Sequence, residues 1–256
     1  HHEIHFTIEQ GIEILDQLIW HLETYDVTSV RASTPMYFLS KAITEKGIKV
    51  VLSGEGADEI FGGYLYFRNA PSVEDFQKET IERVQKLFTA DLLRADKSTM
   101  AHGLEARVPF LDKAFLDMAV RIKPEEKMPK TYDGKEKYIL RKAFDTPDNP
   151  YLPDEVLWRQ KEQFSDGVGY NWIDQLIEYC SSQVTDEQLA GAEAEFPYNT
   201  PTTKEAYFYR SIFNKYYPQV SAAQTVRKWI PKWQENQDPS GRANAAHVQA
   251  DVEIAK

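Results

Sequence analysis

Three carboxylate residues stand close together after a short apolar run in the sequence VVLSGEGADEIFGGY, residues 50–64. At this spacing Glu55, Asp58 and Glu59 repel one another unless a cationic partner offsets their charge. In open parallel sheets, ligands bind beyond the carboxyl ends of the strands, where this loop would lie. Magnesium commonly takes one or two carboxylates together with substrate phosphates, so the loop is a candidate site for a magnesium–polyphosphate complex.

The same loop is open to other interpretations. One carboxylate could serve as a general base, and Gly54 and Gly56 would let a ligand approach the backbone closely. The alternative is an exposed turn that caps the next helix. A Gly-x-Gly pattern alone does not decide between these two interpretations.

Basic residues elsewhere could supply the offsetting charge. Arg159 and Lys161 begin the sequence RQKEQFSDGVGY, just after an apolar helix, and side chains of this kind suit a polyphosphate. A solvated basic helix end is the alternative. Arg31, before a predicted helix start, could meet a carboxylate or a phosphate.

Other residues of types that could take part in catalysis or bind a metal are better explained by structural roles. Glu105 and Arg107 stand among apolar neighbours, which favours a structural ion pair, or clamp, over a catalytic pair. The histidines of HHEIHF do not favour a metal site, because on a strand His2 would face away from His1 and His5. The single cysteine, Cys180, is predicted to be a small buried residue. A stripe of aromatic residues is typical of a helix face that packs in the core. Its members are Tyr207, Phe208, Tyr209, Phe213, Tyr216 and Tyr217.

The elements that position these residues change character along the chain. The first quarter predicts, in order, a strand over residues 3–7, a helix over 8–24, a polar connection over 25–34, a helix over 35–46 and a buried strand over 48–53. Ser33 or Thr34 would cap the second helix, and Gly47 would end it. Helix, tight turn and buried strand form the rhythm of a parallel α/β sheet.

Helical patterns dominate the rest of the chain. They cover residues 72–100, 112–121, 134–145, 153–159, 170–190 and 203–217. We therefore predict an α/β fold in which residues 1–70 form a partial parallel sheet and 71–220 a large helical body. Residues 221–256 turn polar and small, which predicts a partly disordered tail.

Composition narrows the function classes. The formal charge of −10 and the lack of a basic stripe argue against nucleic acid as a partner. No apolar run approaches the roughly 20 residues of a membrane helix. One cysteine rules out an internal disulfide framework and fits a reducing compartment, so we expect a cytoplasmic protein.

Five separated blocks resemble one known family. They are ETYDVTSVRASTPMY, VVLSGEGADEIFGGYLYF, GLEARVPFLD, WRQKEQFSDGVGYNWI and FPYNTPTTKEAYFYR. Together they resemble the C-terminal synthetase domain of glutamine-hydrolysing asparagine synthetases, of the bacterial type. The resemblance implies a sheet of the adenine nucleotide α-hydrolase (ATP pyrophosphatase) type with a helical body.

The resemblance also implies a reaction and its ligands. ATP would activate the side-chain carboxylate of aspartate as β-aspartyl-AMP, and ammonia would then displace AMP to give asparagine. Ammonia would come from glutamine through an N-terminal glutaminase domain. ATP and Mg²⁺ are the implied cofactors, and a homodimer is a further expectation.

Site residues follow from the matching motifs. Ser53 and Gly54 resemble nucleotide contacts, and Glu55 resembles a residue that contacts ATP and accepts a proton from ammonia. Asp58 resembles a contact to magnesium-bound pyrophosphate, directly or through the phosphates. Lys161 resembles a lysine that faces the phosphates.

Two less central positions complete the predicted site. Arg31 resembles a residue that helps to position ATP or aspartate, and Asp91 matches another acidic position. We expect Lys161 and Arg31 to close on the acidic loop from elsewhere in the chain.

Two family features are missing from this sequence. The pyrophosphate loop Ser-Gly-Gly-x-Asp-Ser would lie on a strand before His1, and the glutaminase domain with its nucleophilic cysteine is absent. We therefore expect a fragment that cannot make asparagine by itself. Its unpaired sheet edge would leave apolar surface exposed.

Two other functions stay open at this point. A ring-closing ligase of the β-lactam synthetase kind would share the acyl-adenylate chemistry but need no ammonia. A non-catalytic module would bind nucleotide without turnover. Product analysis with aspartate, and a Glu55→Gln substitution, would separate the three.

Overall fold

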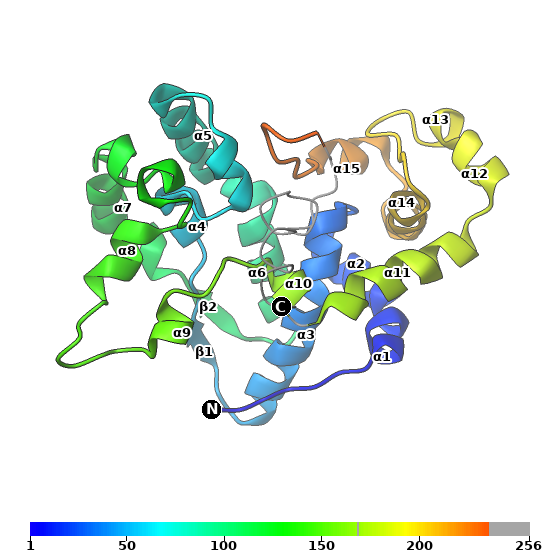
Figure 1. Cartoon of the computed structure of the whole chain (residues 1–256). Coiled ribbons are helices and arrows are strands. Elements are labelled where there is room, and N and C mark those ends of the chain that lie inside the picture. The colour runs from blue at the N-terminus through cyan, green and yellow to red at the C-terminus, as the bar shows by residue number, and fades with distance from the viewer. Residues whose placement is uncertain (168, 236–256) are drawn as a thin grey trace, which may run out of the picture. The chain divides into compact units, whose positions relative to one another are not determined.

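The computed structural model describes residues 1–167 and 169–235 (Figure 1). Within them the chain forms two compact units, each assembled from separate segments. Unit 1 comprises His1–Val51, Phe88–Arg107 and Gln163–Ile230, and unit 2 comprises Leu52–Leu87, Val108–Glu162 and the chain from Pro231. The predicted domain limits near residues 70 and 220 stay predictions. Of the predicted tail, residues 236–256 lie outside the described residues.

Unit 1 is mainly helical. Its helices are α1 (Ile8–Glu13), α2 (Leu15–Leu22), α3 (Val27–Glu45), α6 (Asp91–Met100), α10 (Phe164–Gly167), α11 (Tyr170–Gln183), α12 (Asp186–Ala190), α13 (Ala192–Glu195), α14 (Lys204–Tyr216) and α15 (Val220–Thr225). Its strands are β1 (Val50–Leu52), which ends at the first residue of unit 2, and β2 (Glu105–Arg107). The predicted tail thus begins with a short helix, α15.

Apart from α5 (Val73–Lys86), the described elements of unit 2 are short. The others are α4 (Ala57–Phe61), η1 (Leu65–Asn69), η3 (Pro109–Leu111), α7 (Lys113–Val120), η4 (Pro124–Glu126), η5 (Pro129–Tyr132), α8 (Tyr138–Ala143) and α9 (Asp154–Leu157). The 3₁₀ turn η2 (Leu87–Thr89) stands where the chain passes back to unit 1. It divides the predicted helix 72–100 into α5 and α6.

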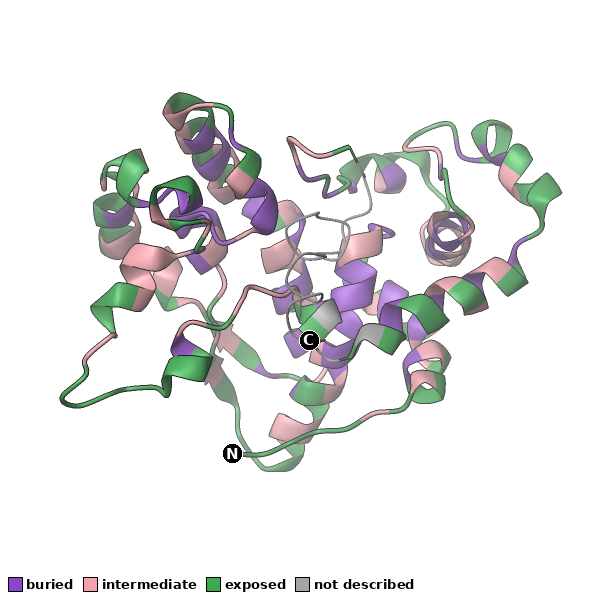
Figure 2. Ribbon diagram, in the orientation of Figure 1, coloured by how far each residue is buried: buried purple, intermediate pink, exposed green. Residues whose placement is uncertain are grey.

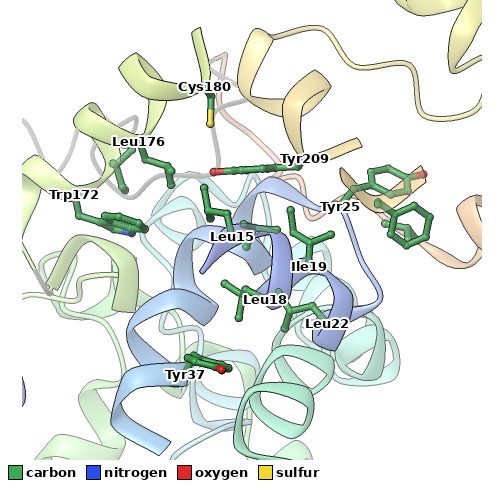
Figure 3. Packing of buried hydrophobic residues seen from close by; sticks show 14 of the residues in the cluster. Leu15, Leu18, Ile19, Leu22, Tyr25, Tyr37, Trp172, Leu176, Cys180 and Tyr209 are labelled. Carbon is green, nitrogen blue, oxygen red and sulfur yellow. The ribbon is translucent and has the colours of Figure 1, made fainter. Parts of the chain in front are cut away.

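The core of unit 1 is organised around α2. Leu15, Leu18, Ile19 and Leu22 recur at helical spacing, so they share one face and are all buried. Figure 3 shows them beside side chains of α11 and α14. The predicted helix over residues 8–24 is confirmed, apart from a break at Ile14 between α1 and α2.

Two sequence predictions about this core are confirmed. Cys180 is buried in α11, and its pKa is raised to about 12, chiefly because burial disfavours the thiolate. Most of the aromatic stripe lies on α14, where Tyr209 and Phe213 are buried in this core and Tyr207 is buried in a second cluster with Phe196. The cysteine therefore contributes to packing.

The predicted polar connection over residues 25–34 is wrong, because α3 already begins at Val27. Asp26 is the N-cap, and its carboxylate accepts a hydrogen bond from the Ser29 backbone N–H at 2.9 Å. Pro35 lies inside the helix and cannot donate to the carbonyl of Arg31 four residues earlier. Trp172 replaces that bond, since its Nε1 donates to the Arg31 carbonyl at 3.2 Å.

The described sheet has two parallel strands, β1 and β2. The predicted strand over residues 48–53 is confirmed at Val50–Leu52, but its predicted burial is wrong, because Val50 and Leu52 are exposed, Leu52 by 76%. Figure 2 shows the exposure of each part of the chain by colour. Within the described residues, β2 is the one strand that pairs with it. The sequence did not predict β2, which is short and polar.

The predicted strand over residues 3–7 is also wrong, because this segment has no regular secondary structure. No described strand pairs with it, and an isolated strand leaves its backbone groups without ladder partners. Phe6 instead packs its ring on Phe38 and Trp172. Thr7 then caps α1 through a capping box.

Candidate active site

The acidic loop enters helix α4 through a glycine that packing requires. Gly56 is the N-cap of α4 with φ of 95°, and a Cβ there would lie 2.5 Å from Leu111 Cδ2. Ile60 and Phe61 anchor the helix in the apolar core of unit 2, against Ala119 of α7. The loop and the carboxylates at positions 58 and 59 therefore stand on a fixed element.

Asp58 lies between two lysines from distant parts of unit 2. Lys137 Nζ is 2.8 Å from Asp58 Oδ1, and Lys161 Nζ is 3.4 Å from Oδ2. We call these three residues the Asp58 cluster. About one fifth of each side chain is exposed. Burial would raise the pKa of Asp58, but the ammonium groups of Lys161 and Lys137 outweigh it and hold that pKa below its ordinary value.

Gly63 makes room for this carboxylate. A Cβ at position 63 would lie 1.9 Å from Asp58 Oδ1, which is far inside van der Waals contact. The first glycine of this pair, Gly62, ends α4 in the left-handed conformation with φ of 63°. The sequence Phe-Gly-Gly after the acidic loop thus shapes the pocket of Asp58.

Lys161 is held by several groups besides Asp58. Its Nζ donates to the Glu162 carbonyl at 2.7 Å and stands 6.0 Å from the centre of the Tyr64 ring. The Tyr64 hydroxyl donates to the carboxylate of Glu59, which is buried. Glu59 therefore supports the site through Tyr64, while Asp58 faces the lysines.

The structure brings Asp58 and Lys161 together, as the sequence predicted, and adds Lys137. Reasoning from the sequence missed Lys137, because one lysine in the stretch DGKEKY carries no motif. The glycine in that stretch, Gly134, has φ of 81° and marks a special turn, but it does not indicate a site.

Residues before α4 lie open to solvent or partly so. Ser53 and Glu55 are half-buried, and Gly54 is exposed. A Cβ on Gly54 would meet nothing within 4 Å, so packing within the chain does not require glycine there. The roles of these three residues toward a nucleotide stay predictions.

Arg31 and Asp91 belong to unit 1. The Arg31 guanidinium is buried and binds Glu205 through both ends of the carboxylate, at 2.8 Å and 2.6 Å. Asp91 forms an ion pair with Arg94 at 3.1 Å. The sequence did not identify Glu205, and the roles of Arg31 and Asp91 toward substrates stay predictions.

Three other groups singled out in the sequence lie in exposed ion pairs. Arg107 pairs with Glu105 at 2.7 Å, and both side chains are more than half exposed, so the role of this pair as a structural clamp stays a prediction. Arg159 pairs with Glu162 at 2.6 Å and is exposed. His1 and His5 each stand 3.7 Å from the carboxylate of Glu3.

The Asp58 cluster does not fit a magnesium ion bound directly by the protein. Both oxygens of Asp58 already face ammonium groups, and a cation placed there would be repelled. Among the described residues, no group of three His, Cys, Asp or Glu side chains is arranged to hold a metal. The two lysines make the cluster a candidate for an anionic ligand instead.

Comparison with known proteins identifies the family of the chain. A sequence model of the asparagine synthase family matches residues 1–79 and 68–244. The chain belongs to the asparagine synthase family.

Several relatives bear a more specific name. The chain is 58% identical over 253 residues to a probable glutamine-hydrolysing asparagine synthetase of Dictyostelium discoideum, covering 97% of this chain and 45% of the relative. It is 58% identical to asparagine synthetase 1 of Saccharomyces cerevisiae, covering 96% and 44%, and 52% identical to the Zea mays enzyme, covering 98% and 45%. The chain thus spans less than half the length of these relatives. All three are eukaryotic, so the predicted bacterial type is not supported.

Within residues 1–167 and 169–235, none of the helices has the length and apolar character needed to span a bilayer.

Proposed function

We propose that this chain is part of an ATP-dependent ligase that converts aspartate into asparagine with ammonia drawn from glutamine. The observation that carries the proposal is the Asp58 cluster, where the acidic loop after β1 meets Lys161 from a distant segment. The names of the relatives support the same reaction. The sheet would be of the adenine nucleotide α-hydrolase type.

The first step joins two anions and therefore needs cationic groups. A side-chain carboxylate oxygen of aspartate attacks the α-phosphorus of ATP, and the bond from that phosphorus to the bridging oxygen breaks. Pyrophosphate leaves with the electron pair, and β-aspartyl-AMP remains. Lys161 would bind the departing phosphates, because a fixed ammonium offsets their charge at no cost of reorganisation.

The second step needs a proton acceptor. Ammonia attacks the acyl carbon of β-aspartyl-AMP, its nitrogen loses a proton, and the bond from carbon to the AMP oxygen breaks. Glu55 would accept the proton. Ser53 and Gly54 would contact the nucleotide, and the open space at Gly54 suits such an approach.

Further parts of the proposal extend beyond the cluster. Magnesium would accompany the phosphates, since Asp58 is already engaged by lysines. Arg31 would act on ATP or aspartate only indirectly, through the packing of unit 1. A glutaminase domain would supply ammonia, and the enzyme would act in the cytoplasm as a homodimer, which sedimentation would test.

The test uses the full-length protein with ATP, aspartate and ammonia. We expect asparagine, AMP and pyrophosphate in equal amounts, and loss of asparagine formation in Glu55→Gln with ATP binding kept. A product made without ammonia would indicate a ring-closing ligase. ATP binding with no pyrophosphate release would indicate a non-catalytic module, and either result would contradict the proposal.

A further inference from the structure

The segment that follows Ile230 is fastened to helix α5 by a lysine. Lys232 Nζ lies 2.5 Å from a carboxylate oxygen of Glu79 and 2.7 Å from one of Glu82, three residues further along α5. Glu79 is buried, whereas the Lys232 side chain is 42% exposed. Burial would lower the pKa of Lys232, but the two carboxylates outweigh it and raise that pKa above its ordinary value. The lysine is therefore held in its charged form.

The backbone of this segment is strained at the next residue. Trp233 has φ of 57°, in the left-handed region that a bulky residue rarely adopts. Asn69 Nδ2 donates to the Trp233 carbonyl at 3.1 Å, and the Trp233 ring lies 6.0 Å from the Tyr66 ring. A strained residue persists where its surroundings over-determine it. Contacts with η1 and α5 thus fix residues 232 and 233 on unit 2.

Glu79 connects Lys232 to the aromatic residues of η1. The Tyr66 hydroxyl donates to Glu79 Oε1 at 2.8 Å, and Arg83 Nε donates to the same oxygen at 2.6 Å. Lys232 faces the other oxygen, Oε2. A buried carboxylate is costly where its charge is not offset, so loss of Lys232 would let Glu79 reorient and would move the Tyr66 hydroxyl with it.

Tyr66 belongs to a stack of rings that ends beside Lys161. We call Tyr64, Tyr66 and Phe67 the ring stack. The Tyr66 ring lies 4.6 Å from that of Phe67 and 6.0 Å from that of Tyr64, with angles of 20° or less between the ring planes. The Tyr64 ring in turn lies 6.0 Å from Lys161 Nζ. Lys232 and Lys161 thus stand at two ends of one connected set of contacts within unit 2.

We propose that Lys232 is a positioning residue: its ion pair with Glu79 fixes the ring stack that stands beside Lys161. This role rests on the proposed function of Lys161 in binding phosphates. It does not require contact between Lys232 and the ligand. Binding of a polyphosphate therefore depends on a residue that lies far along the chain from the acidic loop.

The test measures exchange of labelled pyrophosphate into ATP by the full-length protein at varied pyrophosphate and aspartate. In Lys232→Met we expect the KM for pyrophosphate to rise about fivefold, as for coupling through packed side chains. We expect the KM for aspartate to stay within about twofold of the parent. Partial unfolding lowers the amount of active protein but moves neither KM, so this split separates positioning from lost stability. An unchanged KM for pyrophosphate would overturn the proposal.

A second variant tests the connection through Tyr66. Tyr66→Phe removes the hydroxyl that binds Glu79 and keeps the ring, so it should raise the KM for pyrophosphate by a similar factor. In Lys232→Met/Tyr66→Phe the connection is already broken, so we expect no more than the larger single effect. Effects that multiply would mean two independent roles and overturn the proposal. If Lys232→Met does not fold, an unchanged KM in Tyr66→Phe would still overturn it.

A matched control stands on α8. Lys142 Nζ pairs with Asp145 at 2.7 Å, as Lys232 pairs with Glu82, and its side chain is 56% exposed. We expect parental KM values in Lys142→Met. A rise equal to that in Lys232→Met would assign the effect to overall charge and overturn the proposal.

One further variant separates this proposal from the proposed function. If Lys161→Met binds pyrophosphate as tightly as the parent in calorimetry, the phosphate role of Lys161 is refuted, and both proposals fail. If Lys161→Met binds weakly while Lys232→Met keeps the parental KM, only the positioning role fails.

Discussion

Removing Arg31 should destabilise unit 1 strongly, because its partner would be left as an unpaired buried charge. The Arg31 and Glu205 side chains are only 3% and 4% exposed, and two hydrogen bonds join them. Breaking one side of a buried pair costs about 3–5 kcal/mol. For a chain of this size, that cost lowers the melting temperature by roughly 10 °C.

The assay is calorimetric unfolding of Arg31→Met beside two companion variants. The double variant Arg31→Met/Glu205→Leu removes both charges, so we expect most of the lost stability to return. The control, Lys215→Met on α14, breaks an exposed pair with Asp16 at 2.8 Å and should cost about 1 kcal/mol or less.

Two results would refute this reasoning. One is a loss in Arg31→Met no larger than in Lys215→Met, which would mean that the buried pair contributes little. The other is a double variant as unstable as Arg31→Met, which would assign the loss to packing. If stability is kept while ATP affinity collapses, Arg31 has the ligand role predicted from the sequence.

Three further outcomes follow from single contacts. Gly63→Ala should abolish pyrophosphate binding, because its Cβ would lie 1.9 Å from Asp58 Oδ1; binding at parental affinity in calorimetry would contradict this. Cys180 should resist thiol labelling at pH 8 until the protein unfolds, since its pKa is about 12; rapid native labelling would disprove it. Hydrogen bonds from Lys232 and a second lysine lower the pKa of Glu82 to about 2, so its stabilising contribution is complete above pH 4.5 and lost as pH falls toward 2. An acid titration should therefore show less loss of stability over that range in Glu82→Gln, and identical curves would contradict the assignment.

The centre of the candidate site could be predicted from the sequence, because its residues lie in two recognisable motifs. The acidic loop and the RQKEQF segment each contain a grouping of charges, and the family resemblance implied that Lys161 closes on the loop; Asp58 and Lys161 do meet. Lys137 could not be predicted, since its left-handed backbone depends on contacts of Glu136 and Arg141 that no local pattern shows.

The errors in the fold have tertiary causes. Residues 27–34 resemble a loop because serine and threonine favour caps and turns, yet burial holds them in α3, where Ser33 and Thr34 are fully enclosed. The β-branched run at Val50 predicted a buried strand, whereas burial depends on which elements cover the sheet.

The most direct test of the account is exchange of labelled pyrophosphate into ATP by the full-length protein. The account predicts exchange that requires aspartate and falls by at least about a hundredfold in Lys161→Met, with the protein still folded. Exchange that proceeds without aspartate, or that persists at the parental rate in Lys161→Met, would contradict the claim that this lysine serves the adenylation of aspartate.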